Sequence, residues 1–126
     1  MAVYKLFPTK DASLYSEFPS TNTGLDQILE ASTYLKEGVP YVSRYLIEFS
    51  TTEIQDILNN KVGSSSFATY LRNYSALVTS LNTDSKLEVK TVSGSWDMGT
   101  GVLGYQPAVE NGCSWVWRSY SGSNAW

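Results

Sequence analysis

The clearest pattern along the chain is the alternating run from Val42 to Phe49. Successive side chains of a β-strand point to opposite faces, so residues two apart share a face. The apolar residues that share one face of this run are Tyr45, Ile47 and Phe49. We therefore predict that the strongest strand of the protein lies here and that these three residues have a structural role.

A helix is predicted directly after this strand. Ser50 and Glu53 have the spacing of a capping box, in which each residue bonds a free backbone N–H of the first helical turn. Apolar residues then follow with helical spacing at positions 54, 57 and 58. The pattern predicts one short α-helix over about residues 51–60, with Ser50 and Glu53 as structural residues.

Other segments also alternate between apolar and polar residues or are short and bounded by turn formers. The predicted strands are Val3–Phe7, Ala12–Ser16, Ile28–Thr33, Phe67–Tyr74, Leu87–Val92 and Ser114–Arg118, with Ala76–Leu81 as a continuation. Leu87 and Val89 are expected to point inward, and residues 18–26 and 93–104 are expected to be loops. Six to eight short strands in 126 residues predict an all-β fold, a β-sandwich forming a single domain over residues 1–126.

Composition then narrows the function. The chain has no histidine, one cysteine, 17% charged residues and a net charge of −3. The commonest general base and zinc ligand is therefore missing, and neither an internal disulfide nor a multi-cysteine metal site is possible. Scattered lysines and arginines do not form a nucleic-acid-binding stripe, and there is no membrane-spanning run or secretory signal. We expect no enzyme activity, no cofactor, no metal, no nucleic-acid or membrane partner, and synthesis in a cytoplasm.

Aromatic residues are the candidates for ligand contact, because 13% of the chain is Phe, Trp or Tyr. Inward Trp115 and Trp117 are expected to be structural, since a β-sandwich core needs large apolar side chains. Trp96 lies beside Asp97 in a glycine-rich loop, and together with Tyr105 these residues are the candidates for contact with a ligand such as a sugar ring.

Three weaker alternatives concern polar residues and the cysteine. The oxygen atoms of Asp11, Asn22, Asp26 and Glu30 suit Ca²⁺, but their spacing matches no EF-hand loop. No two carboxylates are placed together by the sequence, so a glycosidase is not expected. Cys113 is expected to be a small buried residue rather than a reactive thiol.

Four segments taken in order carry a family resemblance. They are Asn22–Asp26 (NTGLD), Ser43–Phe49 (SRYLIEF), Ser93–Gly99 (SGSWDMG) and Gly112–Arg118 (GCSWVWR). This order resembles the DNRLRE-type jelly-roll domain. The whole chain is similar to the N-terminal part of virion structural proteins of tailed marine phages, cyanophages among them, of the tail, neck or fibre type.

The resemblance implies a jelly-roll β-sandwich, a location in the virion after synthesis in the host cytoplasm, and other virion proteins as partners in a symmetric particle. Such proteins continue beyond the point where this chain stops. We therefore expect either that residues 1–126 are the N-terminal portion of a longer chain or that a neighbouring chain supplies the missing strand, because an open apolar edge favours aggregation.

Two functional hypotheses follow. The first is a virion structural protein that acts by assembly and adhesion through faces rich in Tyr and Trp. The alternative is a carbohydrate-binding module that recognises a host-surface glycan. A glycan site predicts two or three aromatic rings lying flat on one solvent face, whereas assembly predicts a broad apolar surface that matches a partner chain.

Overall fold

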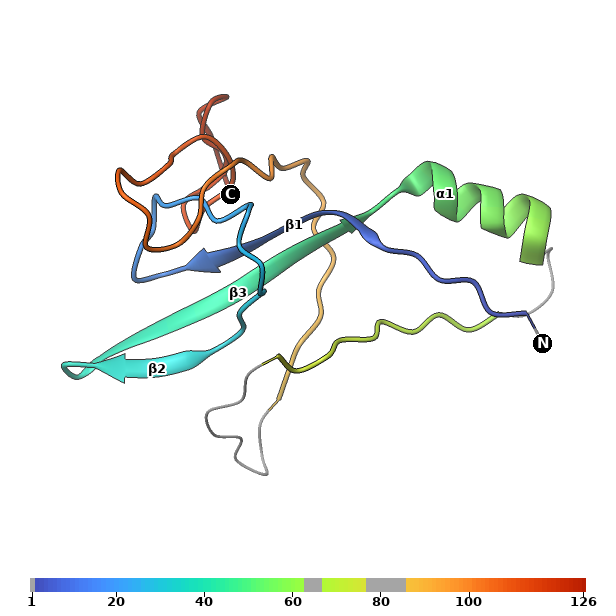
Figure 1. The fold of residues 1–126 in the computed structure, drawn as a ribbon, viewed down its shortest axis with the longest axis horizontal. Helices are drawn as coiled ribbons and strands as arrows, with labels where there is room; N and C mark the ends of the chain where they lie inside the picture. The colour runs from blue at the N-terminus through green and yellow to red at the C-terminus, as the bar shows by residue number, and fades with distance from the viewer. Residues whose placement is uncertain (1, 63–66, 77–85) are drawn as a thin grey trace.

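The computed structural model describes residues 2–62, 67–76 and 86–126. Its main sheet is antiparallel and has the strand order β1–β3–β2, formed by β1 (Pro8–Tyr15), β2 (Thr33–Lys36) and β3 (Val39–Phe49) (Figure 1). Near the C-terminus, β4 (Trp117–Ser119) and β5 (Asn124–Ala125) pair as a second, two-stranded sheet. Within these described ranges, no helix is long and apolar enough to cross a membrane.

The predicted central strand is confirmed and is longer than expected. β3 begins at Val39, three residues before the predicted start, because the hairpin turn of Glu37 and Gly38 brings the chain back directly along β2. Both turn residues have positive φ, 53° and 81°, the conformation of a two-residue hairpin turn whose twist matches the flanking strands.

The core lies on the face of β3 that carries Leu46. Leu46 pairs with Ala12 of β1, and both belong to the apolar cluster at the sheet. The buried members of this cluster are Ala12, Leu14, Trp96 and Cys113, with Leu46, Met98 and Trp115 packed against them. Tyr45, Ile47 and Phe49 share the opposite face, where they are only half-buried. The apolar residues Tyr45, Ile47 and Phe49 therefore predict the strand correctly, but the core packs against the opposite face of the strand.

The predicted helix is confirmed at its start and differs at its end. α1 (Thr51–Asp56) begins after Ser50, whose hydroxyl accepts a hydrogen bond from the Glu53 backbone N–H at 3.2 Å. The chain then continues as a π-helix, η1 (Ile57–Val62), instead of ending near residue 60. Neither helical segment has a fully buried residue, and together they project from the end of β3 (Figure 1).

Several predicted strands are wrong. Residues 3–7 form no strand, and β1 begins directly after them at Pro8. The segment 28–32 is irregular, and a strand begins only at Thr33. Residues 67–76 and 86–92 are exposed and belong to no strand, so Leu87 and Val89 do not point inward. The last predicted strand is shortened to Trp117–Ser119, and residues 77–81 of the predicted continuation lie outside the described residues.

These errors have one physical cause. Alternation shows that a segment is compatible with a strand, but a strand forms only when its backbone finds a partner. The described residues form a β-rich, antiparallel architecture with one short α-helix. The jelly-roll sandwich stays a prediction.

Candidate functional site

Asn22 joins three loops at one end of the main sheet. Its side chain is fully buried, and its Nδ2 group donates to the carbonyls of Met98 at 2.7 Å and Cys113 at 2.8 Å. Its Oδ1 atom accepts from the N–H groups of Gly101 at 2.7 Å and Gly24 at 3.3 Å. A primary amide has two donor hydrogens and one acceptor oxygen with two lone pairs, so every bonding position of this side chain is used. We call the loops that meet here (residues 18–26, 96–104 and 109–114) the loop cluster.

The glycines of the loop cluster are explained by the space around Asn22. A Cβ atom on Gly99 would lie 2.3 Å from Asn22 Oδ1, and one on Gly101 would lie 2.1 Å from the Asn22 carbonyl oxygen. Gly99 also has a φ of 75°, which L side chains rarely adopt. The glycine-rich stretch predicted as a loop is therefore tightly packed around one buried amide.

Asp26 fixes a second point of the loop cluster. Its Oδ1 atom accepts a hydrogen bond from the Leu103 N–H at 2.9 Å. Asn111 and Thr100 hold the neighbouring part of the loop through a reciprocal pair of hydrogen bonds at 2.7 and 3.0 Å. These contacts give Asp26 a local structural role, as its place in a turn-forming segment indicates.

The calcium alternative finds no support in the described part of the chain, which has no group of three or more acidic, cysteine or histidine side chains placed to hold a metal ion. The carboxylate of Glu30 instead accepts hydrogen bonds from the hydroxyls of Ser32 at 2.5 Å, Ser43 at 3.2 Å and Tyr15 at 3.4 Å. Burial raises the pKa of Tyr15 to about 12. These hydrogen bonds connect the irregular segment before β2 to the sheet.

The structure separates the three candidate contact residues. Trp96 is only 4% exposed and belongs to the core, so the expectation that it contacts a ligand is corrected. The Lys10 ammonium lies 5.6 Å from its ring centre. The Asp97 carboxylate accepts a hydrogen bond from the Ser119 hydroxyl, while its backbone bonds Arg118 and Cys113. Tyr105 is 71% exposed, so of the two aromatic candidates it is the one whose ring is accessible to a ligand. A glycine-rich loop was a poor guide to exposure because its glycines permit close packing.

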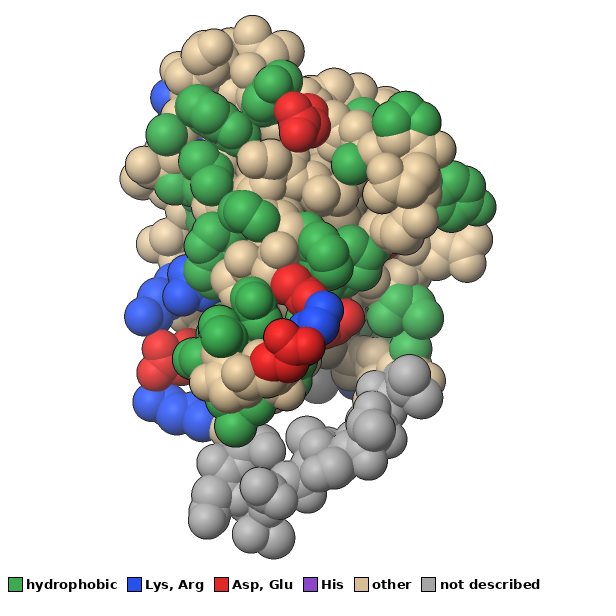
Figure 2. Space-filling model, turned by 90° about the vertical axis from the view of Figure 1, so that its left-hand side faces the viewer, with side chains coloured by type: hydrophobic (Ala, Val, Ile, Leu, Met, Phe, Trp, Pro, Cys, Tyr) green, Lys and Arg blue, Asp and Glu red, His purple; other side chains and the backbone are tan. Residues whose placement is uncertain are grey.

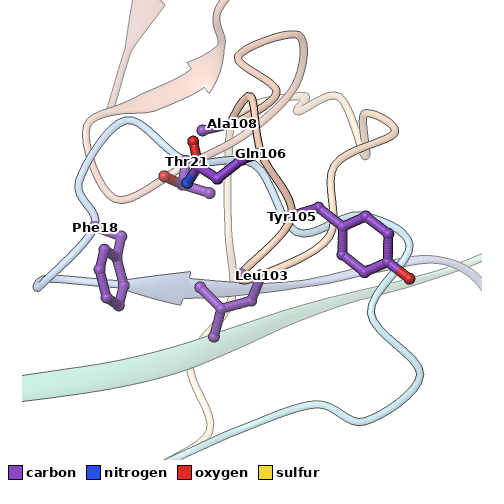
Figure 3. A pocket seen from close by; sticks show the side chains of 7 residues that line it. Phe18, Thr21, Leu103, Tyr105, Gln106 and Ala108 are labelled. Atoms are coloured by element: carbon purple, nitrogen blue, oxygen red, sulfur yellow. The ribbon is translucent and has the colours of Figure 1, made fainter.

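Tyr105 lies at a shallow cavity on the loop cluster (Figure 3). The cavity has a volume of about 210 Å³ and is lined mainly by Phe18, Thr21, Leu103, Tyr105, Gln106 and Ala108. The rings of Phe18 and Tyr105 come from loops far apart in the sequence and both are exposed. No charged side chain lines the cavity, so it suits a small uncharged group with an apolar face.

Of the two tryptophans expected in the core, Trp115 lies there, whereas Trp117 is half-buried outside the core cluster. Trp115 packs against the core cluster, and the Arg44 guanidinium lies 4.8 Å from its ring centre. Trp117 meets Tyr120 edge to face with ring centres 5.9 Å apart. Cys113 is fully buried, and burial raises the pKa of its thiol to about 12. The prediction of an inert buried cysteine is confirmed, because the reactive thiolate is suppressed at neutral pH.

A different feature, which the sequence reasoning did not identify as a site, lies in residues 86–92. We call these residues the free strand. The Glu88 carboxylate lies between Lys86 and Lys90, with N–O distances of 2.8 and 3.2 Å. Hydrogen bonds from Lys86 and Lys90 lower the pKa of Glu88. These ion pairs join residues that are two positions apart, so the three side chains lie on the same face of the segment. Side chains two apart share a face in an extended chain. The predicted alternation is therefore present in space, although no strand pairing accompanies it.

The free strand exposes both its apolar face and its backbone. Leu87 is 59% and Val89 is 72% exposed. None of the backbone groups of residues 86–94 makes a hydrogen bond with another described residue. Unpaired backbone groups along an extended segment form a template for another strand.

Exposed apolar side chains are frequent elsewhere as well. Figure 2 shows many hydrophobic side chains reaching the surface on one face, among mostly uncharged groups. Large exposed members outside the free strand include Val3, Phe7, Leu35, Phe67, Tyr70 and Tyr74. Apart from Leu35, they come from the extended segments that were predicted as strands.

Comparisons of the chain with protein-family models, with curated proteins and with solved structures find no match. The functional argument therefore depends on the contacts and surfaces described above and on the resemblance of the sequence segments.

Proposed function

We propose that this chain is a bacteriophage virion structural protein, associated with the tail, neck or fibre, that acts by assembly and adhesion and not by catalysis. The observation that carries this proposal is an imbalance in the apolar residues. Among the described residues, five hydrophobic side chains are buried whereas twenty large ones are exposed. A domain that works alone buries most of its large apolar side chains, and an extended apolar surface is typical of a site for another protein.

The total surface supports the same conclusion. The chain exposes 9710 Å², whereas a compact monomer of 14.0 kDa is expected to expose about 6,700 Å². The excess is about 3,000 Å², and permanent complexes bury 2,000 Å² or more in their interfaces. An area of this size is sufficient for a permanent interface.

The assignment to a virion is based on the resemblance of four segments, among them those containing Asn22 and Trp96, to proteins of tailed phages. In this proposal the partners are other virion proteins, and the jelly-roll sandwich is completed when neighbouring chains cover the exposed segments. Many copies around a symmetric particle would strengthen a modest contact through avidity.

Mass spectrometry of purified phage particles tests this proposal. Denaturing and then native measurements should find peptides of this chain in the particle and an oligomer or a larger complex under native conditions. If the protein is instead found only free of particles and as a monomer of 14.0 kDa, the proposal is wrong.

A carbohydrate-binding module is the second candidate, and the cavity beside Phe18 and Tyr105 favours it. A sugar ring presents an apolar face to an aromatic ring and hydroxyls to polar groups such as Gln106. NMR titration of the protein with a panel of simple methyl glycosides tests this candidate. Shifts in the amide signals of residues 103–108 that Tyr105→Ala removes, and that the control Tyr70→Ala at another exposed tyrosine leaves unchanged, would support it. Without such shifts this candidate is excluded for these sugars.

A further inference from the structure

We infer that the free strand, residues 86–92, pairs with the open edge of β2 in a second copy of this chain. The inference depends on the proposed function, because it names the partner and the contact through which assembly takes place. It goes beyond that function in assigning a donor strand, an acceptor edge and a direction to the contact.

The donor is already shaped for pairing. The ion pairs of Glu88 with Lys86 and Lys90 gather three charged side chains on one face of the extended segment. Leu87 and Val89 occupy the other face and are exposed. A segment that is extended before it binds loses less conformational entropy on pairing than a disordered one does.

The acceptor is the outer edge of β2. In the sheet order β1–β3–β2, β2 pairs with β3 on one side only, and all four of its residues are exposed. Leu35 alone is 74% exposed and offers an apolar contact for Leu87 or Val89. Edge strands of this kind accept an added strand through main-chain hydrogen bonds.

The charges of the two strands are compatible. Lys36, at the end of β2, is paired with Glu17 at 2.5 Å, and Glu88 is paired with two lysines. Each strand therefore carries its own counter-charge, so pairing does not force an unpaired charge against a like charge. Hydrogen bonding to Lys36 lowers the pKa of Glu17.

A second copy is the occupant that the area and the arrangement favour. The excess surface of about 3,000 Å² is of the size that a permanent interface between chains requires. Donor and acceptor are not paired within one molecule, because β2 pairs only with β3 and the backbone of residues 86–92 makes no hydrogen bond with β2 of its own chain. Two different patches that meet between copies form a head-to-tail contact, which closes into a ring or continues as a fibre. Either outcome suits a symmetric particle.

Proline substitutions in the donor provide the first test. Proline removes a backbone N–H, and successive N–H groups of a strand point to opposite sides. Of the two variants Val89→Pro and Lys90→Pro, one therefore removes an N–H that faces the acceptor. We expect that variant to weaken self-association at least about ten-fold, since main-chain bonds provide much of the affinity of strand addition. Analytical ultracentrifugation measures the association, and circular dichroism confirms that the chain is still folded.

Side-chain variants provide the matched control. The double variant Leu87→Ser/Val89→Ser removes the apolar face and should also weaken association. Asn59→Ser/Asn60→Ser changes the same number of exposed residues on η1, outside the donor and the acceptor edge, and should leave association within about three-fold, because exposed residues outside a contact contribute little. Equal effects of the two double variants would overturn the inference.

A mixing experiment identifies the edge. One preparation carries Leu35→Cys, and the other carries Val89→Cys, in a chain whose own cysteine is buried. A short bismaleimide linker should join the two variants in a mixture, and neither variant to itself. Oligomers that form without this cross-link, and that survive both proline variants, would overturn the inference while leaving the proposed assembly role intact. A monomer at all concentrations would overturn both.

Discussion

The loop cluster and the free strand differ in whether their polar groups have hydrogen-bond partners. Around Asn22, every bonding position of a fully buried amide is used, and the neighbouring glycines leave no room for a side chain. Along residues 86–92, the backbone has no hydrogen-bond partner among the described residues, and apolar side chains face solvent. The hydrogen bonds of the loop cluster are therefore complete within a single chain. The free strand, in contrast, has the shape of a strand without its neighbour.

The largest expected effect comes from removing the buried amide. Asn22→Ala leaves the carbonyls of Met98 and Cys113 and the N–H of Gly101 without their partner. Because buried polar groups without partners are costly, we expect a loss of about 4 kcal/mol in the free energy of unfolding. Urea denaturation followed by tryptophan fluorescence measures it. The control Asn60→Ala removes one exposed hydrogen bond to Asp56 and should cost less than about 1 kcal/mol. Similar losses in both variants would contradict the importance of Asn22.

The second prediction compares one leucine from each region. Leu14 is buried in the core cluster, whereas Leu87 is exposed on the free strand. We expect Leu14→Ala to lower the free energy of unfolding by about 3 kcal/mol because it leaves a cavity. Measured on the monomer by urea denaturation at low protein concentration, Leu87→Ala should change that free energy by less than about 0.5 kcal/mol. A large effect of Leu87→Ala there would show that this residue is part of the core.

The third prediction separates backbone strain from crowding at the loop cluster. Gly99 and Gly104 have similar positive φ angles, 75° and 83°, but only Gly99 lies against Asn22. A Cβ atom at Gly104 meets nothing within 4 Å. Both alanine variants should therefore be strained by about 1 kcal/mol, and Gly99→Ala should lose about 2 kcal/mol more through the clash. Thermal unfolding of the two variants provides the comparison, and equal losses would mean that the packing around Asn22 yields easily.

The smallest predicted effect is a dependence on alkaline pH. The folded-state pKa of Cys113 is raised from 9.0 to about 12, so above pH 9 the unfolded chain releases a proton that the folded chain keeps. Stability is therefore present in full below pH 9 and is lost as the pH rises toward 12. At pH 10 the free energy of unfolding that has been lost through Cys113 is about 1 kcal/mol. Urea denaturation at pH 7.5 and pH 10 should show a smaller decrease for Cys113→Ala than for the unchanged protein, and parallel decreases would contradict the assignment.

The sequence predicted local features better than long-range ones. β3 and the Ser50 cap were found because each depends on residues close together in the chain. The strands predicted at 3–7, 67–74 and 87–92 have the right alternation, but a pattern within one segment does not show whether a partner is present. The burial of Trp96 depends on β1, which lies more than 80 residues away, so its place in a glycine-rich loop led to the prediction that it contacts a ligand.

The candidate site was predicted least well for the same reason. Asn22 was noted as a loop residue and as a weak calcium candidate, and its partners lie 76 to 91 residues later. A fully buried asparagine has no signature of its own in a single sequence. The repeated glycines after Trp96 were the available signal, because they are also what close packing against a buried amide requires. Tyr105 was selected correctly as exposed, but Phe18 and Leu103 beside it were not selected.

The position of Asn22 also affects the order of events while the protein is being made. The strands β1, β2 and β3 are complete once the first 49 residues have left the ribosome, so the hairpins can form early. The amide of Asn22 receives its last partner only when Cys113 emerges, 91 residues later. Contacts of such long sequence separation form slowly. We therefore expect the nascent chain to hold a preformed sheet next to an unclosed loop cluster until residue 113 has emerged, a period in which chaperones have access to it.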